Sequence, residues 1–578
     1  MKYINSFLLI LLMQTTASQA QTYITNVTVA DVKKQVLLPN RTVVITNDLI
    51  TDISSKKINI PEQATVVDGS GKFLFPGLTD AHVHFFQNGG LYTRPDVIDL
   101  RAIQPYEKEM ELAHKTMEDK LRRYLQNGIT QVIDVGASYA YLQQREQYKN
   151  KAFSPGIFMT GPLLTTYQPP IYEISRQETP FSLVRSIEDG IKMVQEQLPY
   201  NPDFIKIWYI AGADGLTPAA SAQKNLPIIK ASIEEAHKHN LKVAVHATQR
   251  ITAQLAVENG CDILVHSIDD ELLKEDFIQL LKKKKTILCP TVVVGDGYRQ
   301  TLGQNLQLSR HELLSADPFQ LGSLMDLKHI SDTALVNRYK IILNSAAQKE
   351  KQKKENDLIA RNLKLLSDAG VLIATGTDAG NIGTLHAASY LRELQAMSAA
   401  GMSNWQIIQA STINGAKVLN RESEFGSIEK GKKANLLLLD ANPVEKIENI
   451  GSIDRVINRG HILDPDTLLK ETPEALAQRQ LNAYNQGNIE AFLEPYAEDV
   501  EIYEFPDKLL EKGKAQMRKS YTEFFQRNPV LHCQLLGRTV KGNIVIDQEK
   551  VIFRGGSMEA IAIYQVENNQ IKKVFFIQ

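Results

Sequence analysis

The sequence predicts an α/β protein with a (β/α)₈ barrel at its centre and a separate α+β domain at its end. Eight short apolar runs alternate with helical stretches, strand-rich patches flank that region on both sides, and the composition changes after about residue 470. The chain has 578 residues, too many for one ordinary domain, so two or three domains are expected.

The barrel is assigned to residues 76–416. The apolar runs taken as its strands are 73–78, 131–133, 157–159, 204–208, 242–245, 263–265, 286–288 and 371–374. Doubly wound sheets alternate in the same way, but they usually carry a glycine-rich phosphate-binding turn, and this sequence shows none. The connection between the last two runs, residues 298–366, is long, polar and helical in pattern, so we expect it to form a lid.

The first twenty residues have the pattern of a secretory signal peptide. Lys2 is followed by an apolar run at residues 7–13 and by small residues up to Ala20, where cleavage is expected. The run is too short to span a membrane. The sequence therefore predicts a secreted or periplasmic protein.

The net charge and the cysteine count indicate which kinds of binding partner to expect. The formal net charge is -1, which gives no support for binding to nucleic acid or to an anionic membrane. Only three cysteines occur, so no disulfide framework is indicated. We expect a small-molecule substrate, no membrane span once the signal is removed, and possible assembly into a homo-oligomer.

A pair of histidines gives the strongest chemical signal. His82 and His84 end the first apolar run, and alternate residues of a strand point the same way. Two neutral imidazoles side by side suit a zinc-like ion. A lone pair of this kind is often accidental, but this one lies where barrel enzymes place catalytic groups.

Further ligand-type residues end other strands. His246, His266 and Asp378 each follow an apolar run, at the same predicted end of the barrel. Each one alone is better explained as a structural residue. Four histidines and one aspartate together are better explained by convergence on a metal.

Lys206 lies within an apolar strand, where an ammonium group is costly to bury. One interpretation is a lysine whose long stem reaches solvent or a carboxylate. The other is a lysine carbamylated by CO₂, which becomes a carboxylate able to bridge two cations.

These motifs together resemble the amidohydrolase superfamily, most closely its imidazolonepropionase-like and Xaa-Pro dipeptidase (prolidase)-like branch. The resemblance covers nearly all of residues 22–465. The matching segments are 76–84, 127–136, 202–206, 245–247, 265–267, 374–378, 410–416 and 426–435.

The resemblance implies a role for each candidate residue. His82 and His84 would bind the more buried of two Zn²⁺ ions, and His246 and His266 the other. Lys206, as N6-carboxylysine, would bridge them. Asp378 would ligate the buried metal and act as the catalytic proton shuttle. Residues 21–75 and 417–465 would pair into one composite β-sandwich beside the barrel.

One departure from the family pattern bears on the reaction. Deaminases and imidazolonepropionases of the superfamily usually carry a glutamate three residues after the histidine of the fifth strand. This sequence has Gln249 there, and an amide cannot relay a proton as a carboxylate does. Gln249 and Lys206 both favour hydrolysis of an acyl bond over deamination of a heterocycle.

The terminal region, residues 470–578, resembles the nuclear-transport-factor-2-like (NTF2-like, SnoaL-like) family. The resemblance rests on residues 481–492 and 496–500. It implies an α+β cone and says little about function, because such domains bind small molecules, catalyse reactions or dimerise.

The resulting expectation is an exported, metal-dependent hydrolase that cleaves the C–N bond of an amide, such as a dipeptide or an N-acyl amino acid, with a metal-activated hydroxide. A hydrolase of cyclic amides, lactones or esters is the rival enzyme. A non-catalytic binding protein is the rival from another class.

Overall fold

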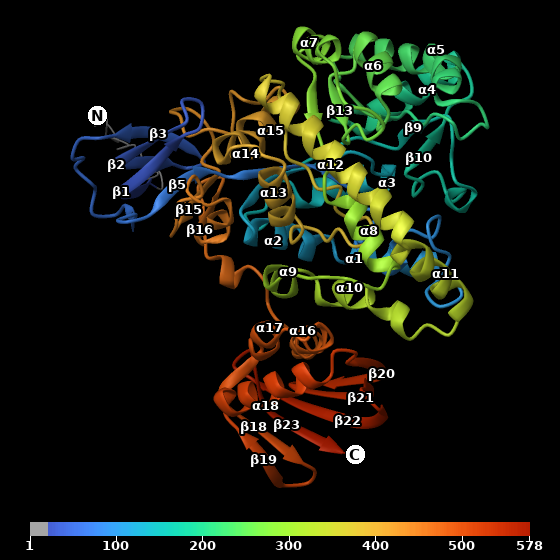
Figure 1. The fold of residues 1–578 in the computed structure, drawn as a ribbon. Coiled ribbons are helices and arrows are strands. Elements are labelled where there is room, and N and C mark those ends of the chain that lie inside the picture. Colours follow the sequence, from blue (N-terminus) through green and yellow to red (C-terminus); the bar gives the residue numbers. More distant parts are fainter. Residues whose placement is uncertain (1–20, 578) are drawn as a thin grey trace, which may run out of the picture.

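A computed structural model describes residues 21–577 (Figure 1). The expected signal peptide lies outside the described residues. The predicted α/β fold class is confirmed. A survey of the helices within residues 21–577 finds none with both the length and the apolar character needed to cross a membrane.

Strands that precede the barrel in the sequence and strands that follow it form one eight-stranded sheet. Its order is β17-β16-β15-β5-β1-β2-β3, with β4 paired to β1. The strands are β1 (Gln21–Asp31), β2 (Val36–Thr46), β3 (Leu49–Ser54), β4 (Thr65–Asp68), β5 (Phe73–Pro76), β15 (Leu436–Leu439), β16 (Ile453–Asn458) and β17 (His461–Leu463). The two segments meet where β5 runs antiparallel to β15. Buried Ile24, Val43, Leu436 and Ile457 share one core, so neither segment completes this unit alone.

This pairing corrects one predicted strand. The run 73–78 was taken as one barrel strand, but it is two strands, and Phe73–Pro76 belongs to the composite sheet to which the predicted bounds had assigned residues 21–75. Strand β5 ends before Gly77, and the first barrel strand, β6 (Leu78–Val83), begins after it. A Cβ at Gly77 would lie 2.2 Å from the Thr130 hydroxyl oxygen, so only glycine fits at this break.

The barrel strands pair in parallel around the centre of the molecule. Seven positions are formed by β6, β7 (Ile129–Asp134), the short strands β8 (Gly156–Met159) and β9 (Leu163–Thr165) together, β11 (Ile205–Trp208), β12 (Val243–His246), β13 (Ile263–Val265) and β14 (Ile287–Cys289). Strand β10 (Phe181–Leu183) lies beside β9. The eighth position is an extended segment rather than a regular strand. Its Leu372 carbonyl accepts from Leu288 N at 2.9 Å, and its Thr375 carbonyl accepts from Ala81 N at 2.8 Å, which joins β14 to β6.

Helices cover the outside of these strands (Figure 1). They are α1 (Tyr106–Lys115), α2 (Met117–Gln126), α3 (Tyr139–Tyr148), α4 (Ile187–Gln197), α5 (Pro218–Lys238), α6 (Arg250–Glu258), α7 (Glu275–Lys284), α13 (Tyr390–Ala399), α14 (Asn404–Ser411) and α15 (Ile413–Val418). In α2 the apolar side chains Leu121, Tyr124 and Leu125 fall on one face and are fully buried, and this amphipathic pattern seats the helix against β7.

The long connection before the eighth position folds into five helices. They are α8 (Val294–Leu302), α9 (Arg310–Ser315), α10 (Pro318–Ser323), α11 (Thr333–Asn344) and α12 (Ala346–Asp368). Ser309 and Glu312 form a capping box that starts α9, and the Asp317 carboxylate caps α10. The sequence thus specifies where these short helices begin.

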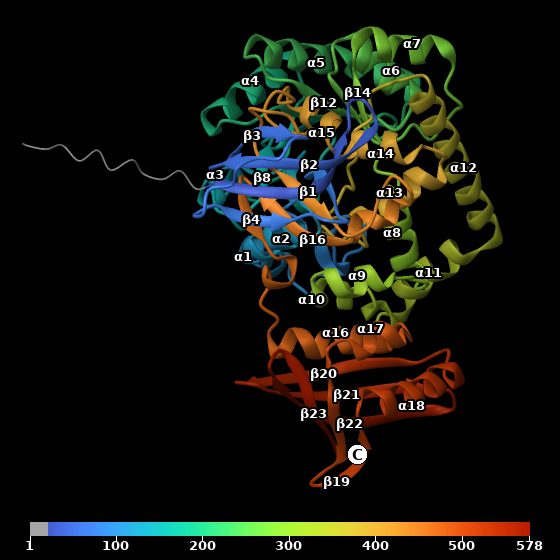
Figure 2. The same cartoon turned by 90° about the vertical axis from the view of Figure 1, so that its left-hand side faces the viewer.

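The terminal domain places three helices on one face of a six-stranded sheet (Figures 1 and 2). The helices are α16 (Pro473–Asn485), α17 (Ile489–Leu493) and α18 (Lys514–Arg527). The strands are β18 (Tyr496–Glu504), β19 (Lys508–Lys512), β20 (His532–Lys541), β21 (Ile544–Phe553), β22 (Gly556–Glu567) and β23 (Gln570–Ile577).

Direct contacts join the terminal domain to the barrel's long insertion. Helices α16 and α17 lie against α9 and α10 (Figure 2). Arg479 donates to the Leu313 carbonyl at 3.2 Å, and Asn482 donates to the Pro318 carbonyl at 2.7 Å. The domain is therefore docked on the insertion as well as linked in sequence.

Candidate metal centre

The structure gathers the six predicted site residues at the carboxyl ends of the barrel strands. His82 lies on β6, with His84 two residues further along the chain. Lys206 lies on β11, His246 ends β12, and the loops after β13 and the eighth segment carry His266 and Asp378. A cavity of about 580 Å³ is lined by all of them except His82, which is fully buried.

Three of these side chains meet closely. Asp378 Oδ1 lies 3.2 Å from His82 Nε2 and 3.1 Å from His84 Nε2, and the two Nε2 atoms are 3.2 Å apart. One ligand atom each from His82, His266 and Asp378 falls within 4.8 Å of the others. Neutral nitrogens and a carboxylate oxygen converge on one small volume, as a cation site requires.

The remaining residues lie beside this group. The centroids of the His246 and His266 rings are 4.4 Å apart, and those of the His82 and His266 rings are 4.9 Å apart. Lys206 is 2% exposed and pairs in register with Ala244, two residues before His246. Burial above all, and in addition the positive charge of Lys206, lower the pKa of His82 and His246. Lys206 lines the same cavity as His246.

Burial sets the protonation states of these groups. It lowers the pKa of His82 and His246 to about 3 and that of His266 well below its ordinary value, so these three imidazoles are neutral near pH 7. Burial alone would raise the pKa of Asp378, but His82 and His84 outweigh it and hold that pKa well below its ordinary value. Neutral imidazole and ionised carboxylate are the forms that bind a metal.

Two unpartnered atoms show that these residues fit a cation. His82 Nδ1 and Asp378 Oδ1 are buried and have no hydrogen-bond partner, although Asp378 Oδ1 is close to two imidazoles. Leaving such atoms unpaired in a protein interior costs free energy. A bound metal ion would satisfy the carboxylate oxygen, and this donor set suits zinc.

The backbone is unusual at two of the candidate ligands. His266 has φ 76° and Asp378 has φ 61°, both in the left-handed region that residues other than glycine rarely adopt. Such conformations persist where the surrounding structure holds them, and they concentrate at functional sites. Gly376 shows how tightly this end of the barrel is packed, because a Cβ there would lie 2.7 Å from the His82 Cβ.

Polar neighbours fix the ring orientation of two histidines. His84 Nδ1 lies 3.3 Å from the Gly136 carbonyl oxygen, and His266 Nδ1 lies 2.8 Å from the Thr291 hydroxyl. Each contact leaves the Nε2 atom of that ring available for another partner. Such contacts orient metal ligands and raise their basicity.

We predict that Thr291→Val lowers zinc affinity roughly 10- to 100-fold, because His266 loses the hydroxyl that orients it. Thr291→Ser keeps the hydroxyl and should bind zinc like the unchanged protein. Competition with a chromophoric chelator measures both affinities. Equal zinc affinity in the Val and Ser variants would mean that the hydroxyl does not orient the ring.

Sequence reasoning missed other residues of this region. Asp80 is fully buried and accepts from Thr377 N at 3.1 Å and from the Thr377 hydroxyl at 2.7 Å, which ties β6 to the segment that carries Asp378. Burial raises the pKa of Asp80 to about 7. Its place two residues before His82 was the signal that could have found it, since it shares that face of the strand.

The insertion supplies part of the cavity wall. Tyr298 of α8 and Asn356 of α12 line it. Arg94, from the segment after β6, donates to the Tyr298 hydroxyl oxygen at 2.7 Å and to Asn381 Oδ1 at 2.6 Å. Gln249 begins α6 and is absent from the described residues that line the cavity.

The barrel, with ligand-type side chains gathered where its strands end, has the architecture of a barrel enzyme. The chain belongs to the amidohydrolase family, which it matches over residues 73–463, and it matches the SnoaL-like domain over residues 477–574. Both predicted resemblances are confirmed, and the predicted class, a hydrolase acting on carbon–nitrogen bonds, agrees with this membership.

Curated relatives match over short segments. A 5'-deoxyadenosine deaminase of Methanobrevibacter smithii is 27% identical over 127 residues, which are 21% of this chain and 29% of that protein. An imidazolonepropionase of Geobacillus sp. is 36% identical over 109 residues, which are 18% of this chain and 25% of that protein. The chain thus spans less than a third of the length of either relative.

Solved structures match over the whole barrel region. A Xaa-Pro dipeptidase with bound methionine superposes with a TM-score of 0.59 at 22% identity, covering 77% of this chain and 100% of that one. A prolidase complexed with N-methylphosphonate-L-proline gives 0.59 at 23% identity with the same coverage. At such identities the likeness shows the shared fold.

Proposed function

We propose that the protein is an exported hydrolase with two zinc ions that cleaves the amide C–N bond of a dipeptide or an N-acyl amino acid. The observation that carries this proposal is the convergence of His82, His84 and Asp378 within 3.2 Å. His246, His266 and Lys206 lie beside them at the same end of the barrel.

Lys206 supports the two-metal form of the site. Burial lowers the pKa of its amine to about 8, so roughly a tenth of the amine is neutral near pH 7. A neutral amine is the form that attacks CO₂, and the product, N6-carboxylysine, carries two oxygens. On the strand next to the one that ends in His246, this carboxylate would join the residues that would hold the two cations.

Each group of residues has a defined task in this mechanism. A bound zinc pair would lower the pKa of a bridging water and polarise the scissile carbonyl. Asp378 takes the proton from the attacking water and passes it to the departing amine, which is otherwise a poor leaving group. The neutral histidines hold the ions without competing for that proton.

The substrate class follows from the proton-relay groups. Gln249 stands where deaminases and imidazolonepropionases carry a glutamate, and it lies outside the residues that line the cavity. Asp269, Glu355 and Asp378 line the cavity, and of these Asp378 is the carboxylate that lies against His82 and His84, so we assign the proton relay to it. One carboxylate is sufficient for amide hydrolysis, in which a single proton moves from water to the amine.

A hydrolysis screen of dipeptides, N-acyl amino acids and lactones with zinc-loaded protein tests the proposal. Turnover of the first two classes supports it. Exclusive turnover of lactones or esters would instead favour the rival enzyme. Purification without stoichiometric metal and without any turnover would favour the binding protein. If the protein is exported, it should be recovered from the periplasm or the culture supernatant, and its first residue should be Gln21.

The insertion should act as a lid, because α8 and α12 contribute to the cavity wall. We predict protease cleavage within residues 298–366 and slower cleavage when an inhibitor fills the cavity. Mass spectrometry of the fragments gives the cleavage position and rate. Equal rates with and without inhibitor would contradict the lid.

A chain ending near residue 468 should keep its metal centre, because all six candidate ligands precede residue 379. Removing α16 uncovers apolar residues of α9 and α10 that share its core, so we predict a lower melting temperature with an unchanged turnover number. Calorimetry and kinetics on the same preparation test both. A stable, metal-filled truncated protein without activity would show that the terminal domain contributes to the active site.

A further inference from the structure

A second cavity, of about 480 Å³, lies between the sheet and the helices of the terminal domain. All the residues that line it fall between Gln480 and Phe576, so it shares none with the barrel cavity. Its size is within the range of small-molecule binding sites. Nothing in the barrel chemistry uses it.

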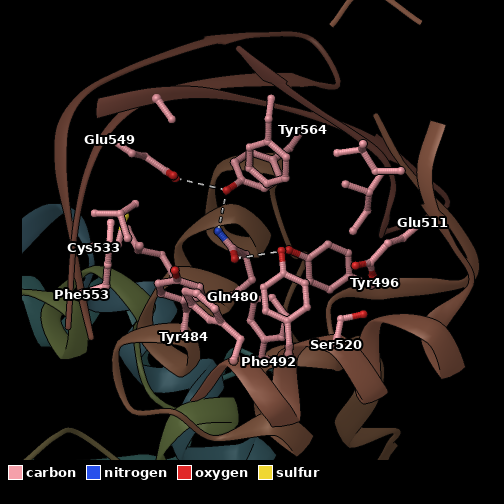
Figure 3. Close-up of a pocket in the computed structure, with 18 of the residues that line it drawn as sticks. Gln480, Tyr484, Phe492, Tyr496, Glu511, Ser520, Cys533, Glu549, Phe553 and Tyr564 are labelled. Atoms are coloured by element: carbon pink, nitrogen blue, oxygen red, sulfur yellow. Dashed lines mark hydrogen bonds between the residues drawn. The ribbon is translucent and has the colours of Figure 1, made fainter. Parts of the chain in front are cut away.

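A directional hydrogen-bond chain crosses this cavity (Figure 3). The Tyr496 hydroxyl donates to Gln480 Oε1 at 3.3 Å, and Gln480 Nε2 donates to the Tyr564 hydroxyl at 2.8 Å. The Tyr564 hydroxyl then donates to Glu549 Oε1 at 3.2 Å. Every donor in the chain points toward Glu549, so its carboxyl group is the final acceptor.

The charged side chains that line this cavity are both acidic. Glu549 is only 5% exposed, and the Oε2 atom of Glu511 is buried without a hydrogen-bond partner. Among the described residues that line the cavity, none is lysine, arginine or histidine. Glu549 already accepts from Tyr564, whereas Glu511 Oε2 has no donor. An ionised carboxylate only accepts hydrogen bonds, so both groups favour a ligand that donates them.

Aromatic rings surround the rest of the space. The centroid of the Phe492 ring lies 4.6 Å from that of Tyr521, 5.4 Å from that of Tyr496 and 6.0 Å from that of Tyr484. Aromatic faces attract cations and pack against flat apolar groups. Acceptors and aromatic faces together favour a cation with an apolar body.

We propose that this cavity binds a small organic amine with an aromatic or branched apolar group, with its ammonium at Glu549 and its body among Tyr484, Phe492 and Tyr521. The acidic wall repels carboxylic acids of the same shape. The bound amine donates to Glu549 and so extends the hydrogen-bond chain that ends there.

Calorimetry of the full-length protein with tryptamine, tryptophol and indole-3-acetate tests the proposal, because these probes share a ring and differ in charge. Tryptamine is expected to bind tightest and indole-3-acetate weakest. Glu549→Gln should weaken tryptamine about tenfold or more and leave tryptophol nearly unchanged. The matched control is Glu559→Gln, an exposed residue of β22 next to the lining residues Met558 and Ala560.

The pH dependence gives an independent readout. Burial and then Asp547 raise the pKa of Glu549 to about 7, while Tyr564, Cys533 and Arg538 act to lower it. Tryptamine stays protonated over this range, so its affinity should rise from pH 5.5 to 8 as Glu549 ionises. Equal or tighter binding of indole-3-acetate, no binding of any probe, or equal losses in Glu549→Gln and Glu559→Gln would overturn the proposal.

Discussion

Asp378→Asn is expected to lower turnover by about 10⁴-fold, because it removes the proton shuttle and a negative charge beside the metals. The fold should survive, because asparagine tolerates the left-handed backbone at φ 61° better than most residues. Some metal should remain bound through His82 and His84. Steady-state kinetics and metal analysis on one preparation measure both effects.

The same substitution at Asp368, an exposed residue at the end of α12, is the matched control and should leave turnover unchanged. An amide does not titrate, so raising the pH to 9 should not restore the activity of Asp378→Asn. Near-normal turnover at any pH would remove Asp378 from the mechanism.

Lys206→Ala should lose metal and activity together, since the bridge between the two ions disappears. The substitution leaves a space beside His246, and short carboxylic acids such as formate or acetate should partly restore activity by occupying it. Lys206→Met fills most of the same volume with an apolar chain, so it should fold, lack the second metal and resist rescue.

Metal content, turnover and rescue by added acid would be measured on both variants. Mass spectrometry of the intact protein, kept in bicarbonate at neutral pH, should show the added CO₂ on the unchanged chain and not on either variant. A Lys206→Ala protein that holds two metals and works normally would refute the bridge.

The sequence was most informative where local patterns decide the structure. Alternating apolar runs predicted the barrel, and the spacing of His82 and His84 predicted that they share one face of a strand. His246 and Asp378 were predicted to reach the same end because parallel strands of a barrel place their carboxyl ends together. The structure brings His84, His246 and Asp378 to the wall of one cavity, with His82 fully buried next to Asp378.

Contacts between distant segments could not be read from the sequence. Residues 73–75 looked like a barrel strand because an apolar run does not reveal its partner, and β5 pairs instead with β15. The hydroxyl of Thr291 reaches His266 only because two loops meet. Likewise, no local pattern indicated that Arg479 would dock on Leu313.

The pairing of β5 with β15 has a consequence for biosynthesis. Pro76 pairs in register with Leu436, roughly 360 residues later in the chain, so the partner strand leaves the ribosome roughly 20 to 70 s after β5 at ordinary elongation rates. During that interval β5 has an unpaired, apolar edge, which is the kind of surface that recruits other chains. A chain destined for export would meet this delay during translocation, where holdase chaperones would have to shield the waiting edge.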